Sequence, residues 1–345
     1  MKKLSLATLL FAGFALPAAA GTYEQCVLDA VSNPNGVEST TQIRERCSEE
    51  AGTSTVVTSS DKSAPAAMTE TFERGAISER IIAEREIQKS RYAILPHKQN
   101  YFLPVTHTSK INREAYDFAG EAFADDLRQT EAKIQVSLKV PLNSEDIFME
   151  GDGIYFGFTA TSWWQVYAND ISAPFRETNY QPEVWYMGGL DWHPMGGNTG
   201  FKVGIEHQSN GRSQLLSRSW NRVYTTFLFE KDDFALAFRP WYRLKEDEKD
   251  DPLDSDGDDN PDIEKYMGHF DLTAAYRLND HEFSMILRNN LRSENKGAVE
   301  LGWSMPIYGN IKGYMQYFNG YGESMIDYNI SQERIGLGIL ISDML

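Results

Sequence analysis

The segment Ile205–Asn221 reads IEHQSNGRSQLLSRSWN, and its pattern predicts a hairpin of two antiparallel β-strands. Residues 211–217 are rich in turn-forming types. A hairpin centred on Gln214 pairs His207 with Asn221, because both are equidistant from the centre. Successive side chains of a strand point to opposite faces, so His207 and Ser209 share one face. The segment therefore predicts a strand pair with three polar side chains gathered on one face.

On both sides of this hairpin, segments of about ten residues alternate in polarity, and short turns alternate with longer polar loops. Twelve strands are predicted, at 100–108, 130–141, 153–168, 179–192, 200–209, 217–230, 234–244, 263–278, 282–292, 298–306, 311–319 and 329–341. A soluble β-sandwich shares the alternation but does not need the regular short-long rhythm. We therefore expect an all-β protein, a 12-stranded antiparallel transmembrane β-barrel with both termini in the periplasm.

Aromatic residues near the expected strand ends are candidates for the interfacial girdles of such a barrel, although any single one could instead fill the core. They are Trp163, Trp164, Trp185, Tyr186, Trp220, Trp241, Tyr242 and Trp303. Beyond residue 20 the sequence has no apolar run of about eighteen residues, the length that a membrane-spanning helix needs. Strands, rather than helices, are thus expected to cross the membrane.

Three regions are predicted along the chain. Residues 1–20 carry Lys2 and Lys3, an apolar run and Ala18-Ala19-Ala20, which is typical of a signal peptide. Residues 21–95 are predicted to form an N-terminal extension, and residues 96–345 the barrel. An exported protein is expected, located in the outer membrane.

Within the extension, Cys26 and Cys47 are the two cysteines of the chain. In an oxidising compartment the simplest interpretation is one disulfide, tying a small helical hairpin. Residues 52–71, rich in Ser, Thr and Ala, are expected to be a flexible linker. Residues 72–91 are charged and able to form a helix. A periplasmic interaction module and an inert extension remain equal alternatives for this region.

The charge of the chain limits its partners. Its 33 basic and 50 acidic residues give a net charge of −17. Removal of Lys2 and Lys3 with the signal peptide makes the protein more acidic still. Such a surface argues against nucleic acid as a partner, since nucleic-acid binding depends on Lys and Arg opposite phosphates.

The three polar residues of the hairpin match the parts of a nucleophilic site. An imidazole beside a hydroxyl predicts a nucleophile, Ser209, and its base, His207. Asn221 is expected to orient the ring of His207 by accepting a hydrogen bond from the other ring nitrogen. An amide holds the imidazole but does not offset the positive charge that develops on it. A bare His-x-Ser pair also occurs by chance on exposed strands, so the pair alone has little specificity.

The sequence around these three residues is more specific. HQSNGRS (207–213) and SRSWN (217–221) resemble the active-site hairpin of the outer membrane phospholipase A family. Matching stretches follow the same order in the family: TSWWQ (161–165), SAPFRETNY (172–180), DDNPDIEKYMG (258–268) and GYGESMIDYN (320–329). The resemblance covers roughly residues 100–345 and leaves out the first hundred.

The resemblance implies a calcium-dependent hydrolase of carboxyl ester bonds in membrane phospholipids, with phospholipase A1/A2 and lysophospholipase activity. It implies a homodimer in the active state. Ca²⁺ would be held by the main-chain carbonyl of Arg212, the hydroxyl of Ser217 and the hydroxyl of Ser172 of the partner subunit. These oxygen ligands suit a hard cation. Ala160 stands where the family has a polar residue on the dimer face.

Two alternatives stay open. Asp254, Asp256, Asp258 and Asp262 alternate around Gly257 and resemble a second Ca²⁺-binding loop, whereas the simpler interpretation of residues 245–264 is a solvated extracellular loop. The second alternative concerns the whole protein, which would be a catalytically inactive barrel with a transport or structural role. Twelve strands leave limited space for a channel, because side chains fill the lumen of small barrels.

Overall fold

The computed structural model describes residues 75–345, apart from residues 89, 91, 92, 120, 252, 255 and 310. The predicted signal peptide, the predicted pairing of Cys26 with Cys47 and the linker at 52–71 lie outside the described residues. Within the described part, every helix is too short or too polar to traverse a lipid bilayer.

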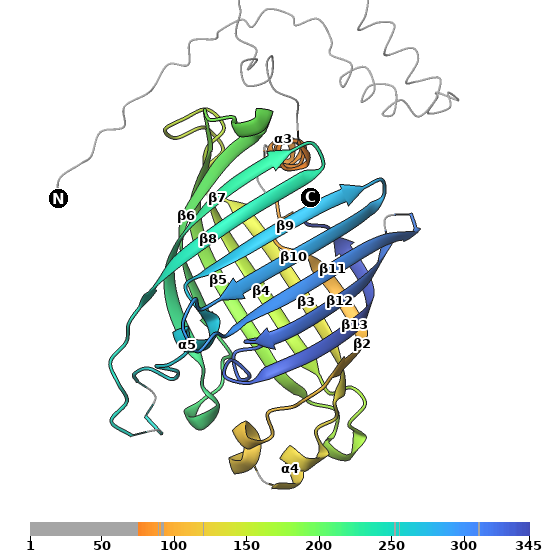
Figure 1. Cartoon of the computed structure of the whole chain (residues 1–345), viewed down its shortest axis with the longest axis vertical. Coiled ribbons are helices and arrows are strands. Elements are labelled where there is room, and N and C mark those ends of the chain that lie inside the picture. Colours follow the sequence, from red (N-terminus) through yellow and green to blue (C-terminus); the bar gives the residue numbers. More distant parts are fainter. Residues whose placement is uncertain are drawn as a thin grey trace, which may run out of the picture. The chain divides into compact units, whose positions relative to one another are not determined.

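Twelve antiparallel strands, β2 to β13, close into one barrel (Figure 1). Each strand pairs with its neighbours in sequence, and the barrel is closed by hydrogen bonds between β2 and β13. The strands are β2 (Asn100–Thr108), β3 (Thr130–Pro141), β4 (Gly153–Trp164), β5 (Phe175–Leu190), β6 (Asn198–Ser209), β7 (Ser219–Lys231), β8 (Phe234–Leu244), β9 (Phe270–Leu278), β10 (His281–Asn289), β11 (Gly297–Tyr308), β12 (Ile311–Tyr321) and β13 (Ser331–Ser342). A short strand β1 (Leu95–Pro96) pairs with β3.

The number and order of the strands confirm the expected barrel, and the largest difference lies before β9. Residues 263–269 were expected to be strand, but Glu264–Met267 forms the helical turn α5. A strand would place Lys265 on the same face as Ile263 and Met267, which are both buried. The helical turn buries these two residues and leaves Lys265 exposed. At the other boundaries, β4 ends at Trp164 rather than 168, and β5 begins at Phe175 rather than 179.

The aromatic residues expected in the girdles divide between the two faces of the barrel wall. Trp163, Trp185, Trp220 and Trp241 are at most 6% exposed and point inward, so their assignment to the girdles was wrong. Their sequence neighbours Trp164, Tyr186 and Tyr242, together with Trp303, lie on the outer face. The alternation of side chains decides this, because a shift of one residue reverses the face that a side chain occupies.

One end of the barrel carries the short turns, the C-terminus and the helix α3 (Ala76–Gln88), which forms within the segment 72–91 where a helix was possible (Figure 1). Glu230 of β7 fixes the first turn of α3, accepting hydrogen bonds from the backbone N–H groups of Ile77 (2.7 Å) and Ser78 (3.0 Å). Arg80 donates to the carbonyl oxygens of residues 96, 343 and 344. The helix is thus tied to the strand ends around it.

The opposite end carries the longer loops, with the short helices η1 (Glu114–Ala119), α4 (Glu121–Asp126) and η2 (Asn169–Ile171) (Figure 1). Inward-facing aromatic residues of the wall pack there against residues of two loops. This buried cluster includes Trp220 and Trp241 from the strands, Ile263 and Met267 from the loop before β9, and Met325 from the loop before β13. The buried core of the protein therefore lies in the interior of the barrel and not on its outer face.

Candidate active site

The hairpin of β6 and β7 has the predicted register. His207 pairs directly with Asn221, and residues 210–218 connect the strands through a short 3-10 helix, η4 (Gln214–Leu216). The buried side chain of Asn210 holds this connection together. Its Nδ2 donates to the carbonyl of Leu216 (2.8 Å), and its Oδ1 accepts from the backbone N–H of Arg218 (3.0 Å). Asn210 was not singled out from the sequence, although its place directly after the strand is typical of a turn-stabilising Asn.

Gly211 follows with a left-handed backbone conformation, at a φ of +62°. A side chain at this position would also approach the ring of Tyr180, because a Cβ atom there would lie 3.0 Å from it. Glycine is the residue that accepts both constraints without strain. The turn that leads away from the predicted nucleophile is therefore fixed by two residues, Asn210 and Gly211.

The predicted triad faces the outside of the barrel. Along β6, the buried residues Gly204 and Glu206 point inward, while Ile205 is 58% exposed and lies on the same outer face as His207 and Ser209. On β7, Asn221 shares the outer face with Val223, which is 37% exposed. The predicted catalytic residues therefore lie beside apolar side chains on the face that a membrane barrel presents to lipid.

His207 and Asn221 are joined by a hydrogen bond of 2.8 Å between Nδ1 and Oδ1. The other side of the amide determines its orientation, since Asn221 Nδ2 donates to Oε1 of Glu246 at 2.7 Å. A carboxylate accepts hydrogen bonds, so the NH₂ group faces Glu246 and the oxygen faces His207. Nδ1 of His207 then carries the proton, and Nε2 is left as the acceptor, in the tautomer that a general base requires.

Ser209 lies two residues from His207 on the same strand, opposite Ser219 of β7 and Tyr180 of β5. Among the described residues, no hydrogen bond joins its hydroxyl to His207. In proteins without bound substrate, catalytic hydrogen bonds are often long and tighten when substrate binds. The structure thus brings the three predicted residues together on one face, with Glu246 as a fourth residue that the sequence did not reveal.

The predicted calcium ligands lie in two loops at the same end. Arg212 and Ser217 are in the β6–β7 connection, and Ser172 lies exposed in the β4–β5 loop with a left-handed backbone. The hydroxyl of Ser217 donates to Oδ2 of Asp259 at 2.6 Å. The guanidinium of Arg212 binds the carbonyl oxygens of residues 175 and 176, and these contacts fix the loop around its main chain. Ser172 forms no hydrogen bond with Arg212 or Ser217 within the described chain.

The aspartates of the 245–264 loop diverge instead of converging on one point. Asp258 binds Arg243 at 2.5 Å, and Asp262 accepts a hydrogen bond from the hydroxyl of Tyr328 at 2.7 Å. Burial and this bond to Asp262 raise the pKa of Tyr328 above its ordinary value. Asp254 accepts from the backbone N–H of residue 251. The described residues contain no cluster of three or more His, Cys, Asp or Glu side chains able to hold a metal ion. Two of these aspartates tie the loop to β8 and to the loop before β13.

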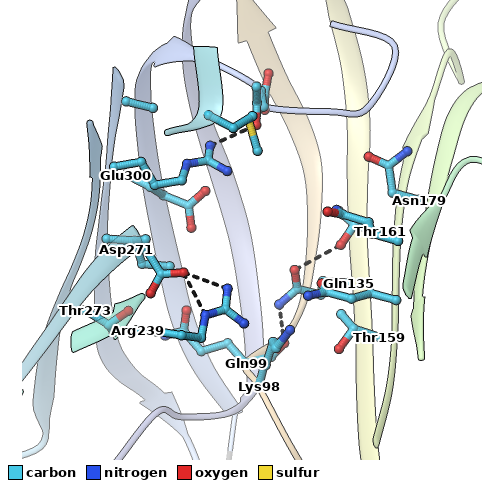
Figure 2. A pocket seen from close by; sticks show the side chains of 18 of the residues that line it. Lys98, Gln99, Gln135, Thr159, Thr161, Asn179, Arg239, Asp271, Thr273 and Glu300 are labelled. Carbon is cyan, nitrogen blue, oxygen red and sulfur yellow. Dashed lines mark hydrogen bonds and ion pairs between the residues drawn. The ribbon is translucent and has the colours of Figure 1, made fainter. Parts of the chain in front are cut away.

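The lumen contains a cavity of about 360 Å³ lined by polar and charged side chains (Figure 2). On one wall, Nε and Nη2 of Arg239 both donate to Oδ2 of Asp271, at 2.9 and 2.6 Å. On the other wall Thr161 donates to Gln135, which in turn donates to the carbonyl of Gln99 (Figure 2). These contacts join neighbouring strands, β8 to β9 and β3 to β4, so the polar side chains that line the cavity hold the wall together.

A larger ion-pair network lies nearer the loops. Arg176 binds Glu131 at 3.0 Å and Asp327 at 2.9 Å, and all three side chains are fully buried. Arg334 binds Glu131 at 2.8 Å and the carboxylate of Glu323 at 2.7 Å. No local sequence pattern indicates this network, because its members come from β3, β5, β13 and the loop before β13. It connects strands on both sides of the barrel closure.

Comparison with known proteins identifies the family. The family model described as Phospholipase A1 matches residues 77–341. The Phospholipase A1 of Escherichia coli K12 is 36% identical over 272 residues, covering 79% of this chain and 88% of that protein. A putative phospholipase A1 of Neisseria meningitidis serogroup B is 40% identical over 223 residues, covering 63% of this chain and 56% of that protein.

Two solved structures have the same fold. The outer membrane phospholipase A of Escherichia coli matches with a TM-score of 0.69 and 36% identity, covering 77% of this chain and 98% of that chain. The outer membrane phospholipase of Salmonella typhi, described as a dimer with bound calcium, matches with the same TM-score, 35% identity and the same coverage. The closed barrel and these relatives fit a location in the outer membrane. The chain belongs to the phospholipase A1 family, whose members are carboxylic ester hydrolases.

Proposed function

We propose that this phospholipase hydrolyses the carboxyl esters of glycerophospholipids with Ser209, His207 and Asn221 as its catalytic triad, and that Ca²⁺ is required. The observation that carries the proposal is the 2.8 Å hydrogen bond between His207 Nδ1 and Asn221 Oδ1, on the outer face that also bears Ser209. Nε2 of His207 is left free to accept a proton from the serine hydroxyl.

The chemistry follows from this tautomer. Ser209 Oγ attacks the ester carbonyl carbon while His207 Nε2 takes its proton. His207 then gives the proton to the leaving alcohol, which produces an acylated serine and a lysophospholipid. A water molecule, deprotonated by His207, hydrolyses the acyl-serine and releases a fatty acid. Asn221 holds the imidazole ring in place during both steps.

The donor set fits Ca²⁺. The carbonyl of Arg212 and the hydroxyl of Ser217 are oxygen donors, and Asp259 places a carboxylate against Ser217. Hard oxygen donors of this kind suit Ca²⁺ rather than a softer metal. Bound calcium would polarise the ester carbonyl beside Ser209. Since one chain supplies few ligands, we propose that Ser172 of the partner subunit completes the site, as the dimeric calcium-bound Salmonella typhi relative suggests.

The topology supports the remaining assignments. An even number of strands puts both ends of the barrel chain at one end, which we propose is periplasmic, and the long loops at the outside. Membrane phospholipid then reaches the triad from the outer leaflet. We propose that residues 1–20 are a signal peptide, residues 21–95 an N-terminal extension and residues 96–345 the barrel. Within that extension, α3 is hydrogen-bonded to the barrel.

The test is hydrolysis of phosphatidylethanolamine in detergent micelles, with calcium and with a chelator. Native protein should release fatty acid only with calcium, and Ser209→Ala should lose activity by about a thousandfold or more. The variant should remain folded, because the Ser209 side chain faces outward and supports no core. Activity retained in Ser209→Ala would remove this residue from its role, and a barrel without any esterase activity would favour the structural alternative.

A further inference from the structure

We propose that Glu246, in the long loop after β8, is a positioning residue of the active site, extending the triad to Ser209–His207–Asn221–Glu246. The inference rests on the proposed function and deepens it. Its starting point is the 2.7 Å hydrogen bond from Asn221 Nδ2 to Glu246 Oε1, on the side of the amide opposite His207.

The strand register brings Glu246 to this place. Asn221 of β7 pairs with Leu244, the last residue of β8, and Leu244 is 43% exposed on the outer face. Glu246 follows two residues later and therefore continues on the same face. The end of β8 thus brings Glu246 within hydrogen-bond distance of Asn221.

The backbone around Glu246 is held on both sides. Before it lies the regular strand β8. After it, the carbonyl of Asp247 accepts a hydrogen bond of 2.7 Å from the N–H of Asp258, and residue 248 forms a β-bridge with residue 258. Asp258 is itself bound to Arg243 of β8. A carboxylate on such a fixed segment keeps one position, which is the requirement for a residue that orients another.

The chemistry gives Glu246 a task that Asn221 cannot perform. When Ser209 reacts, His207 becomes an imidazolium cation, and a neutral amide does not offset this charge. The arrangement Nδ1–H to Oδ1 and Nδ2–H to carboxylate forms a chain in which each hydrogen bond polarises the next. Glu246 thereby places a negative charge two hydrogen bonds away from His207, with Asn221 between them, and the proton remains on the imidazole throughout.

Other charged groups nearby are differently placed. Glu206 and Arg222 are neighbours of His207 and Asn221 along the strands, but they point inward and form a buried ion pair with each other. Lys245 and Asp247 flank Glu246 in sequence, and both side chains are exposed. Glu246 is half-buried, and among the described residues it is the charged residue that is hydrogen-bonded to the triad. Since water screens it in part, we expect a moderate effect.

The experiment compares Glu246→Gln with Glu248→Gln, the same chemical change two residues away at an exposed side chain. Hydrolysis of phosphatidylethanolamine in calcium-containing micelles is measured as kcat and KM separately. Glu246→Gln should lower kcat about fivefold, because a hydrogen bond to a charged acceptor is roughly twice as strong as a neutral one. KM should stay unchanged, and Glu248→Gln should match the native enzyme. Equal kcat values in the two variants would overturn the proposal.

A double-mutant cycle separates positioning from a general effect on the fold. If Glu246 acts through Asn221, Glu246→Gln should cost little further activity in a protein that already carries Asn221→Ala. The same fivefold loss in both backgrounds would show that Glu246 acts elsewhere.

An exchange of the two groups gives the sharpest test. Asn221→Asp alone sets two carboxylates against each other and should lower kcat. Asn221→Asp combined with Glu246→Gln restores one amide and one carboxylate in reversed order, and it should be several times more active than Asn221→Asp alone. A double variant no better than the single one contradicts the proposal. Ser209→Ala is measured alongside. If it is inactive, the proposed triad is supported even when Glu246 has no effect. If it is active, the proposed triad itself is wrong.

Discussion

At the scale of single residues, Asn221 and His207 have different importance for the reaction. Asn221→Ala removes the acceptor of the 2.8 Å hydrogen bond to His207 but leaves the imidazole as a base. We expect turnover to fall roughly ten- to a few hundredfold, whereas His207→Ala should abolish it. Steady-state hydrolysis of a phospholipid by the two variants decides this. An equal loss in both would indicate that Asn221 supports the hairpin itself.

A second residue-scale prediction concerns Asn210, whose amide ties both sides of the β6–β7 connection. Asn210→Ala removes these bonds and leaves two partly buried backbone groups, the carbonyl of Leu216 and the N–H of Arg218, without these partners. The loop that carries Arg212 and Ser217 should become mobile. We expect calcium to bind more weakly, so that a higher calcium concentration is needed for the half-maximal rate of hydrolysis. Circular dichroism should show that the barrel is still folded. An unchanged calcium dependence would contradict this role.

The residues of the site illustrate what a sequence can predict. His207 and Asn221 were paired correctly from the symmetry of a turn around Gln214, because a hairpin relates its strands by simple counting. Glu246 was not predicted. Its position depends on the β7–β8 register and on contacts between residues 247 and 258, which no local pattern expresses. The polarity pattern located the strands correctly. It did not assign Trp163 and Trp185 to the interior, because apolar residues occur on both faces of a lipid-exposed wall.

At the scale of elements, α3 depends on a residue far away in sequence. Glu230 accepts two backbone N–H groups of its first turn, the task usually performed by an N-cap residue next to the helix. Glu230→Ala should loosen the helix by about 1 kcal/mol. Hydrogen exchange of the amides of Ile77 and Ser78 should become faster, while activity toward phospholipid stays the same.

Glu79→Ala serves as the matched control, because Glu79 is an exposed acid in the same turn of α3. Its effect on exchange should be clearly smaller than that of Glu230→Ala. Equal effects would mean that the first turn responds to charge alone and that the contact with β7 contributes nothing. The two ends of β7 thus have separate contacts, since Glu230 binds a helix at one end and Asn221 is hydrogen-bonded to His207, the proposed base, at the other.

At the scale of the whole molecule, the buried ion pairs link the stability of the barrel to pH. Glu323 lies outside the strands; burial opposes its ionisation, but Arg334 and Lys133 outweigh burial and lower its pKa from 4.5 to about 2. A carboxyl with a lowered pKa stabilises the fold above its unfolded value and loses this contribution as the pH falls through its folded value. The barrel should therefore lose stability progressively between about pH 4.5 and pH 2.

Glu323→Gln tests this account. The change leaves Arg334 with Glu131 alone and Lys133 without its nearer carboxylate, which costs up to roughly 3–5 kcal/mol at neutral pH. The midpoint of urea unfolding in detergent should fall accordingly, and its further decrease toward pH 2 should be smaller than in the native protein. Glu294→Gln is the control, since Glu294 is 89% exposed. A native-like midpoint for Glu323→Gln would disprove the contribution of this pair.

The proposed calcium site also makes a prediction for the assembled protein. If each ion is held by Arg212 and Ser217 of one chain and by Ser172 of the partner subunit, calcium and dimerisation must strengthen each other by the same factor. Ser172→Ala should lower calcium affinity and dimer content together, and Asp256→Asn should change neither. Sedimentation in detergent across a calcium titration measures both. Full activity in a strictly monomeric species would exclude the shared site. The dimer content measured in the same experiment also shows how strongly a chain with Ala160 at this position associates.

The outward orientation of His207, Ser209 and Asn221 has a kinetic consequence. A substrate that approaches along the membrane plane is delivered by two-dimensional diffusion, so the effective concentration is the mole fraction of phospholipid in the surface and not its amount per litre. The rate should fall when phospholipid is diluted with inert detergent inside the micelle, and it should stay constant when the same micelles are diluted with buffer. The enzyme thus responds to the composition of the membrane around it.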